Sequence, residues 1–137
     1  MITTKGIYHM GIPVNDVERA VKFYTEVLGM TIAKLNRDDM GDHLNRADLR
    51  SGDSMVVLFQ RPKPMEKDAL KEDGATHQAF TVSPEDFELA AKKMKDWGVK
   101  VYDIPTVERP TGRGFYFFDP DGNLLQLYAP PKTSSAS

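Results

Sequence analysis

The chain has 137 residues, no cysteine, 28% charged residues and a formal net charge of −2. This length fits one compact domain, and the lack of cysteine excludes disulfides, thiolate metal sites and cysteine nucleophiles. Lys and Arg alternate with Asp and Glu, which argues against a nucleic-acid surface. No apolar stretch approaches the ~20 residues of a membrane span, and residues 1–6 lack a signal-peptide core. We therefore expect a globular, cytoplasmic protein without nucleic-acid or membrane partners.

The first strand-like segment introduces a pattern that returns later in the chain. Ile7–Val14 carries His9, and Ala75–Val82 carries His77 at an offset of 68 residues. Each segment is followed by a helix start signal, a run ending in glycine, more strand-like stretches and an apolar strand that runs into prolines. This order predicts two modules, each built as strand–helix–strand–strand–strand.

The first helix is expected to begin after Asn15, because Asn is a favourable N-cap residue. Glu18 then takes the third helical position and completes a capping box, and Gly29 ends the helix. The strands expected after this helix are Thr31–Lys34, Leu44–Arg50 and Met55–Phe59.

The second helix is expected to have Ser83 as its N-cap and Pro84 at its first position. Its buried stripe is predicted to include Trp97, and Gly98 ends it. The segment 119–122 reads as a tight turn that joins the last two strands into a hairpin. The strands expected in this half are Lys100–Ile104, Gly114–Phe118 and Asn123–Tyr128.

These signals predict a single domain over residues 1–131, built from two modules. The first module spans residues 6–61 and the second spans residues 75–131. Residues 62–74 are rich in Pro, Lys and acidic residues, so we interpret them as a solvated linker. Residues 132–137 are expected to form a frayed tail.

The two histidines at equivalent repeat positions are the first candidates for a functional site. Strand alternation gives His9 and His77 each a face shared with small residues, which favours a cavity over a packed core. The remaining histidine, His43, lies in the polar stretch Asn36–Asn45 and is expected to be a surface residue.

Gln126 is the third candidate, because it interrupts a leucine-rich strand. A buried amide without a partner costs roughly 1–3 kcal/mol, so this side chain needs hydrogen bonds or a ligand. Two neutral imidazoles and an amide oxygen are able to hold a divalent cation, or to form a polar network around an organic ligand. Further side chains that could approach a cavity and contact substrate are Arg113, Tyr116 and Tyr128.

Four segments resemble the vicinal oxygen chelate superfamily, which includes glyoxalase I, fosfomycin-resistance proteins, bleomycin-resistance proteins and extradiol dioxygenases. They are Tyr8–Asp16, Phe23–Met30, Thr76–Phe80 and Phe115–Leu127. The resemblance implies an α+β fold in which two βαβββ modules form an open, curved cup of mixed β-sheet, with the helices packed outside. It also implies a homodimer in which the two chains share their sites.

In such a dimer, His9 of one chain and His77 with Gln126 of the other would hold a divalent metal ion (Fe, Mn, Ni, Co or Zn). Metal-dependent members of the superfamily usually have Glu at the position of Gln126. Glutamine offers a carbonyl oxygen without formal charge or useful basicity, so metal affinity is expected to fall.

Two further positions bear on the type of site. Glyoxalase I-like members take a fourth ligand from the first module, where the repeat places Val57 or Leu58, neither of which is able to ligate. Gln60 is nearby and is expected to point outward, so a four-ligand site is not predicted. Fosfomycin-type members place a hydroxyl residue where this chain has Gly11, which argues against that branch.

Two functions remain open at this level. The first is a metalloenzyme of lyase, isomerase or dioxygenase type, whose small-molecule substrate chelates the metal through adjacent oxygens. The alternative is a metal-free protein that binds or sequesters a small molecule, as bleomycin-resistance proteins do. No catalytic residue is assigned, because this scaffold hosts several chemistries.

Overall fold

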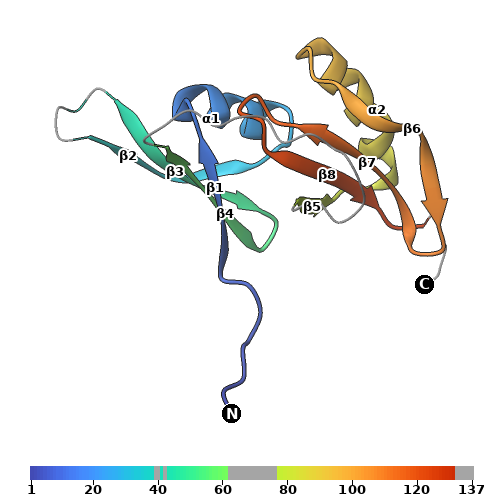
Figure 1. The fold of residues 1–137 in the computed structure, drawn as a ribbon, viewed down its shortest axis with the longest axis horizontal. Helices are drawn as coiled ribbons and strands as arrows, with labels where there is room; N and C mark the ends of the chain where they lie inside the picture. The colour runs from blue at the N-terminus through green and yellow to red at the C-terminus, as the bar shows by residue number, and fades with distance from the viewer. Residues whose placement is uncertain (39–40, 42, 62–76, 132–137) are drawn as a thin grey trace. The chain divides into compact units, whose positions relative to one another are not determined.

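The computed structural model describes residues 1–38, 41, 43–61 and 77–131, without the side chains of residues 103–109. The chain divides into two compact units, unit 1 at Met1–Met65 and unit 2 at Glu66–Ser137 (Figure 1). Each unit contains one four-stranded mixed sheet and one helix, in the order strand–helix–strand–strand–strand. This confirms the predicted α+β fold of two βαβββ modules. The predicted linker 62–74 and tail 132–137 lie outside the described residues.

Unit 1 contains a sheet with the strand order β1-β4-β3-β2, in which β1 runs parallel to β4 and the other pairs are antiparallel. Helix α1 packs on one face of this sheet, against β3 and β4. The four fully buried side chains of α1 recur at helical spacing, as an amphipathic helix on a sheet requires. The elements of unit 1 are β1 (His9–Val14), α1 (Val17–Glu26), β2 (Thr31–Arg37), β3 (Leu44–Ser51) and β4 (Ser54–Gln60).

The start of α1 differs from the sequence prediction. Its N-cap is Asp16 rather than Asn15, and the Asp16 carboxylate accepts a hydrogen bond from the backbone N–H of Arg19 at 3.1 Å. The backbone carbonyl of Asn15 accepts a hydrogen bond from the side chain of Gln60, which ties Asn15 to the end of β4. Because the helix starts one residue later, Glu18 takes the second helical position, and the predicted capping box is wrong.

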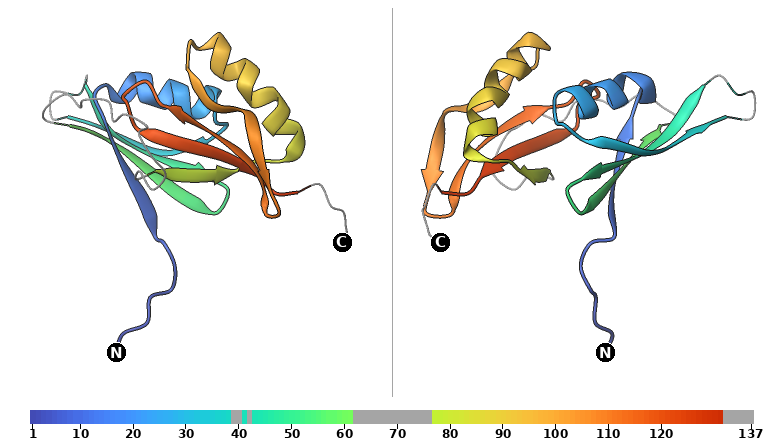
Figure 2. Two further views of the ribbon diagram at one scale, coloured as in Figure 1. Left: turned by 45° about the vertical axis from the view of Figure 1, so that its right-hand side comes forward. Right: turned by 180° about the vertical axis from the view of Figure 1, so that it is seen from behind.

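Unit 2 repeats this plan with the strand order β5-β8-β7-β6, in which β5 runs parallel to β8. Helix α2 covers one face of the sheet (Figure 2). No helix among the described residues has the length and apolar character needed to cross a membrane. The elements of unit 2 are β5 (Gln78–Thr81), α2 (Pro84–Asp96), β6 (Val101–Arg109), β7 (Gly112–Phe118) and β8 (Leu124–Ala129).

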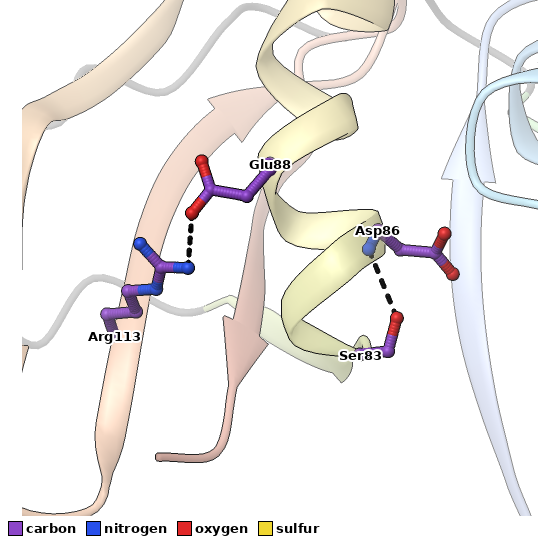
Figure 3. A network of polar contacts seen from close by, with 4 residues as sticks. All are labelled: Ser83, Asp86, Glu88 and Arg113. Atoms are coloured by element: carbon purple, nitrogen blue, oxygen red, sulfur yellow. Dashed lines mark hydrogen bonds and ion pairs between the residues drawn. The ribbon is translucent and has the colours of Figure 1, made fainter. Parts of the chain in front are cut away.

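The predicted start of α2 is confirmed. Ser83 is the N-cap, and its hydroxyl oxygen accepts a hydrogen bond from the backbone N–H of Asp86 at 3.1 Å (Figure 3). At the other end, Trp97 is 37% exposed, so its predicted place in the buried stripe is wrong. Trp97 is the C-cap residue, with a φ of −89° and a ψ of 0°, so the chain has left the helical conformation there and the buried stripe ends before it. Gly98 follows with a φ of 72°, as a helix stop requires.

The predicted turn between β7 and β8 is also confirmed. Asp119 is 2% exposed, and its carboxylate accepts hydrogen bonds from the backbone N–H groups of Asp121 at 2.9 Å and Asn123 at 2.8 Å. Gly122 closes the turn with a φ of 90° and donates its backbone N–H to the carbonyl of Asp119. The turn therefore fixes the register of β7 against β8, the strand that carries Gln126.

Candidate functional site

Gln126 lies in the middle of the unit 2 sheet, between Ala79 of β5 and Tyr116 of β7. Its side chain is 7% exposed, which agrees with the prediction of a buried amide in an apolar strand. The next residue, Leu127, pairs with Phe115, whose ring lies 5.3 Å from the ring of Phe87 in α2. The face of Leu127 is therefore the face that α2 covers, and Gln126 lies on the opposite face.

Two glycines of β7 make room for the side chains beside Gln126. A Cβ atom on Gly114 would lie 3.0 Å from Nε2 of Gln126 and 2.7 Å from Cδ2 of Tyr128. The side chains of Gln126 and Tyr128 therefore lie closely over the bare backbone of β7. Sequence analysis missed this role, although Gly112 and Gly114, spaced by two within a strand, share the face of Gln126.

His77 joins Gln126 through Tyr116. The imidazole of His77 and the phenol ring of Tyr116 meet edge to face, with their centroids 5.0 Å apart and an interplanar angle of 82°. Both side chains are half-buried, and Tyr116 is the cross-strand partner of Gln126. We call these three residues the unit 2 cluster. The structure thus brings two predicted metal ligands and one predicted substrate contact together within a single unit.

Tyr128 lies on the same face as this cluster. It pairs with Gly114, and its hydroxyl lies 2.7 Å from Oγ1 of Thr111 in a hydrogen bond. This bond fixes the ring beside the unit 2 cluster. Thr111 is a second residue that sequence analysis did not single out, since the bond joins positions 17 residues apart.

Arg113 lies on the other face of the sheet from Gln126. Its guanidinium forms an ion pair with Glu88 of α2 (Figure 3). The guanidinium carbon also lies 4.6 Å from the centroid of the Phe87 ring in α2. Arg113 therefore ties α2 to β7, on the face away from the other predicted substrate contacts.

We expect Arg113→Gln to lower the free energy of unfolding by about 0.5–2 kcal/mol, because it removes an exposed ion pair and a cation–π contact. The binding of metal or small ligands should be unchanged, because Arg113 lies on the α2 side of the sheet. Urea denaturation and ligand titration measure the two effects. Weakened ligand binding with normal stability would show instead that Arg113 contacts the ligand.

His9 is the first residue of β1 in unit 1, and its side chain is exposed. Its ring lies edge to face with the ring of Tyr8, with centroids 5.4 Å apart. The face that His9 shares with Gly11 is not lined by small residues alone. A Cβ atom on Gly11 would lie 3.1 Å from Cε1 of Phe59. The Phe59 ring therefore fills the space above Gly11.

The strand register shows which residue of unit 1 corresponds to Gln126. Gly11 follows His9 by two positions and pairs with Val57, just as Ala79 follows His77 by two positions and pairs with Gln126. Of the two residues that the repeat allowed, the register therefore selects Val57, which is apolar and 5% exposed. Gln60 lies on the same face of β4 as the buried Leu58 and donates its side-chain N–H to Asn15. It therefore points away from the face of His9.

His43 lies just before β3 and is exposed, as expected of a surface residue. It borders an open pocket with Asn15, Asp16 and Glu18. Within the described part of the chain, no three side chains of His, Cys, Asp or Glu are grouped closely enough to hold a metal ion. A metal site in this part of the protein would therefore need an amide oxygen as a ligand, or side chains that do not lie together within one such group of three.

Comparisons with known proteins agree with the fold. A family model described as the Glyoxalase/Bleomycin resistance protein/Dioxygenase superfamily matches residues 6–127. The chain is 34% identical over 124 residues to the glutathione transferase FosA of Serratia marcescens, covering 90% of this chain and 80% of FosA. It is 35% identical over 128 residues to the uncharacterized protein YwkD of Bacillus subtilis, covering 90% of this chain and 96% of YwkD.

A solved structure shares the same fold. It is that of a glutamate-to-glutamine mutant of the fosfomycin resistance protein FosX from Listeria monocytogenes, complexed with Mn(II) and 1S,2S-dihydroxypropylphosphonic acid. The TM-score is 0.75 at 19% sequence identity, and the match covers 95% of this chain and 96% of FosX. The sequence argument that Gly11 weakens a fosfomycin-type identification is not supported by the likeness to FosA. The argument considered only the missing hydroxyl side chain. In the structure, the Phe59 ring occupies the space in which a side chain at position 11 would lie.

Proposed function

The chain belongs to the glyoxalase/bleomycin resistance protein/dioxygenase superfamily, and on this premise we propose that it is a metal-dependent enzyme acting on a small molecule. The substrate chelates the metal through adjacent oxygen atoms, and the protein ligands are His9, His77 and Gln126. The observation that carries the proposal is the unit 2 cluster, in which a half-buried imidazole and a buried amide share one face of a sheet.

The residues of the unit 2 cluster fit a divalent first-row ion such as Fe, Mn, Co, Ni or Zn. Imidazole nitrogen and amide oxygen both ligate such ions. The Gln126 side chain is confined over Gly114, and the Tyr116 ring restrains the His77 imidazole. Both donors are therefore partly ordered before a metal arrives, which lowers the entropy cost of binding. The set lacks a carboxylate, so it binds metal less tightly than a His/His/Glu set.

When bound, the metal supplies Lewis-acid stabilisation of negative charge on a substrate oxygen. The chain's own residues then order and enclose the substrate. The Tyr128 ring, held by Thr111, forms one boundary of the binding face. Tyr116 contacts the His77 ring and is the cross-strand partner of Gln126. Gln126 has no useful basicity, so a proton removed from the substrate is accepted by another group or by water. Lyase, isomerase, dioxygenase and group-transfer reactions are all compatible with these roles.

Two chains form a homodimer in this proposal and share their metal sites. His9 is supplied by one chain, and His77 with Gln126 by the other, as the family resemblance implies. The enzyme works in the cytoplasm. Size-exclusion chromatography with light scattering measures the oligomeric state.

Metal content tests the proposal directly. Protein purified without chelator is analysed by mass spectrometry for Mn, Fe, Co, Ni and Zn, and metal-free protein is titrated with Mn²⁺, the ion present in the FosX structure. We expect one ion per chain, and a loss of affinity of about tenfold or more in His9→Ala and in His77→Ala. Arg113→Gln is the matched control, since it lies on the α2 side. The proposal fails if no ion is present in stoichiometric amount and none of the five is taken up.

The second candidate function is metal-free binding or sequestration of a small molecule such as an antibiotic. Gln126 favours it, because a neutral amide suits hydrogen bonding to a ligand as well as it suits a metal. A thermal-shift screen in the presence of EDTA tests this function. Ligands that raise the melting temperature without any divalent ion support it, and ligands that act only with a divalent ion exclude it.

A further inference from the structure

The outer side of α2, which faces away from the unit 2 sheet, carries an exposed apolar side chain (Figure 2). Leu89 is 55% exposed, although its helix buries Phe87, Ala90 and Met94. Among the described residues of unit 2, the large apolar side chains that are exposed are Leu89 and Trp97, the C-cap residue of α2. The exposed apolar surface of unit 2 is therefore concentrated on this one element.

Acidic and basic side chains are arranged around Leu89 in a regular way. Glu85 and Asp86 precede it by four and three positions, and both are exposed. Lys92 and Lys93 follow it by three and four positions and are also exposed. Because an α-helix turns about 100° per residue, Glu85 and Lys92 lie to one side of Leu89. Asp86 and Lys93 lie to its other side. Each side therefore carries an acid in the N-terminal half and a lysine in the C-terminal half.

This arrangement is complementary to itself. If a second copy of α2 lies antiparallel, with a two-fold axis at Leu89, the two Leu89 side chains meet at the centre. The axis places the N-terminal half of one helix against the C-terminal half of the other, on the same side. Glu85 then faces Lys92 of the second copy, and Asp86 faces Lys93 of the second copy. Each contact occurs twice, and the charges that face each other have opposite signs.

The helix dipole explains part of this pattern, because it favours acidic residues in the first turn and basic residues in the last. It does not explain an exposed leucine between them. Helix α1 is a comparison within the chain, since it also covers a sheet. Its outer side has the exposed Lys22 at the centre, opposite the buried Ala20, Phe23 and Tyr24. A second copy of α1 placed in the same way would bring Lys22 against Lys22.

Lys92 remains accessible to a second copy, although it pairs with Asp96 on its own helix at 3.4 Å. Its side chain is 78% exposed, and an ammonium group has three donors, so it is able to bind a second carboxylate. With Glu85 of the second copy, the three charges form a small network, which stabilises a contact better than an isolated exposed pair does.

We propose that the outer side of α2 is an interface with a second copy of this chain, in which two α2 helices pack antiparallel about a two-fold axis at Leu89. This interface is independent of the proposed function, because α2 covers the face of the unit 2 sheet opposite to Gln126. Exposed ion pairs contribute little each, and the contact covers only one helix of each chain. We therefore expect reversible association with a Kd between the high micromolar and the millimolar range.

Sedimentation equilibrium of the full chain in EDTA, from micromolar to millimolar concentration, measures this association. The average mass should rise toward twice its value at the lowest concentration, whether that starting species is one chain or a dimer that shares its metal sites. Added salt should weaken the association, because it screens the ion pairs. Leu89→Glu places two carboxylates at the axis and should raise the Kd about tenfold or more. Lys22→Glu, on the outer side of α1, is the matched control and should associate as wild type does.

Reversal of the charges gives a sharper test. Lys92→Glu combined with Lys93→Glu makes all four charged positions acidic, and Glu85→Lys combined with Asp86→Lys makes all four basic. Neither double variant should associate alone. An equimolar mixture should associate at least as tightly as wild type, because each acidic position then faces a lysine of the other variant. A variant that fails to fold is not restored by mixing, and its melting temperature identifies it.

Three results would overturn the inference. The first is a wild-type mass that does not change with concentration, as expected if another part of the chain covers α2. The second is association of Leu89→Glu or of the acidic double variant that equals that of Lys22→Glu. These two variants keep the N-terminal residues of α2, so they remain informative if the basic variant unfolds. The third is a mixture of the two folded double variants that does not associate.

Discussion

Gly112→Ala is expected to lower the free energy of unfolding by about 2–6 kcal/mol, the largest effect of any substitution considered for this chain. A Cβ atom on Gly112 would lie 2.1 Å from the backbone carbonyl oxygen of Ala129 and 2.9 Å from Cε1 of Tyr128. Ala129 is paired with Arg113 across the β7–β8 ladder, so its carbonyl has no freedom to move away. Gly112 also has a φ of +136°, which side chains rarely tolerate.

Urea denaturation of Gly112→Ala measures this effect, and Gly52→Ala is the matched control. Gly52 also has a positive φ, of +58°, but nothing lies within 4 Å of the position of its Cβ atom. Its replacement should therefore cost only the backbone term, about 1–2 kcal/mol. If the two variants lose equal stability, the close approach of β8 is not the reason for glycine at position 112.

The fold was largely predictable because its signals are local and occur twice. Ser83 with Pro84 marks the start of α2, and the turn at 119–122 aligns β7 with β8, through contacts between residues at most four positions apart. The N-cap of α1 was predicted wrongly because the neighbouring residues Asn15 and Asp16 are equally favourable N-cap residues. The strand predicted to end at Ile104, just before Pro105, continues as β6 to Arg109. As an edge strand it tolerates a proline, and only the sheet order reveals that it is an edge.

The candidate site was less predictable, because its contacts cross strands. The meeting of His77 with Tyr116 joins β5 to β7, past the strand that lies between them. Some of these cross-strand pairs could be predicted from the sequence. Counting back from the turn pairs Tyr116 with Gln126 and Gly114 with Tyr128, which places the bare glycine beside the amide. The same counting places Arg113 on the face away from Gln126.

Gln126→Glu is expected to have opposite effects on metal affinity and on the stability of the metal-free protein. The new carboxylate attracts a divalent ion, so the Kd for Mn²⁺ should fall at least tenfold, or about 1.4 kcal/mol. Without metal, the charge lies in a position that is 7% exposed, and burying it uncompensated lowers the melting temperature. Calorimetric titration gives the affinity, and thermal denaturation in EDTA and in Mn²⁺ gives the two stabilities.

Gln126→Leu is the control that keeps the apolar bulk and removes the oxygen. It should lose Mn²⁺ binding while the metal-free protein stays as stable as wild type, because leucine has nearly the bulk of the amide and shares its face of the sheet with the buried Leu124 and the ring of Tyr116. The two variants show whether Gln126 is a metal ligand or a packing residue. If it is a packing residue, they change the stability of the protein and leave its Mn²⁺ affinity unchanged. Wild-type Mn²⁺ affinity in both variants would remove Gln126 from the ligand set. A loss of stability in EDTA with Gln126→Leu would show instead that the amide stabilises the fold through its own hydrogen bonds.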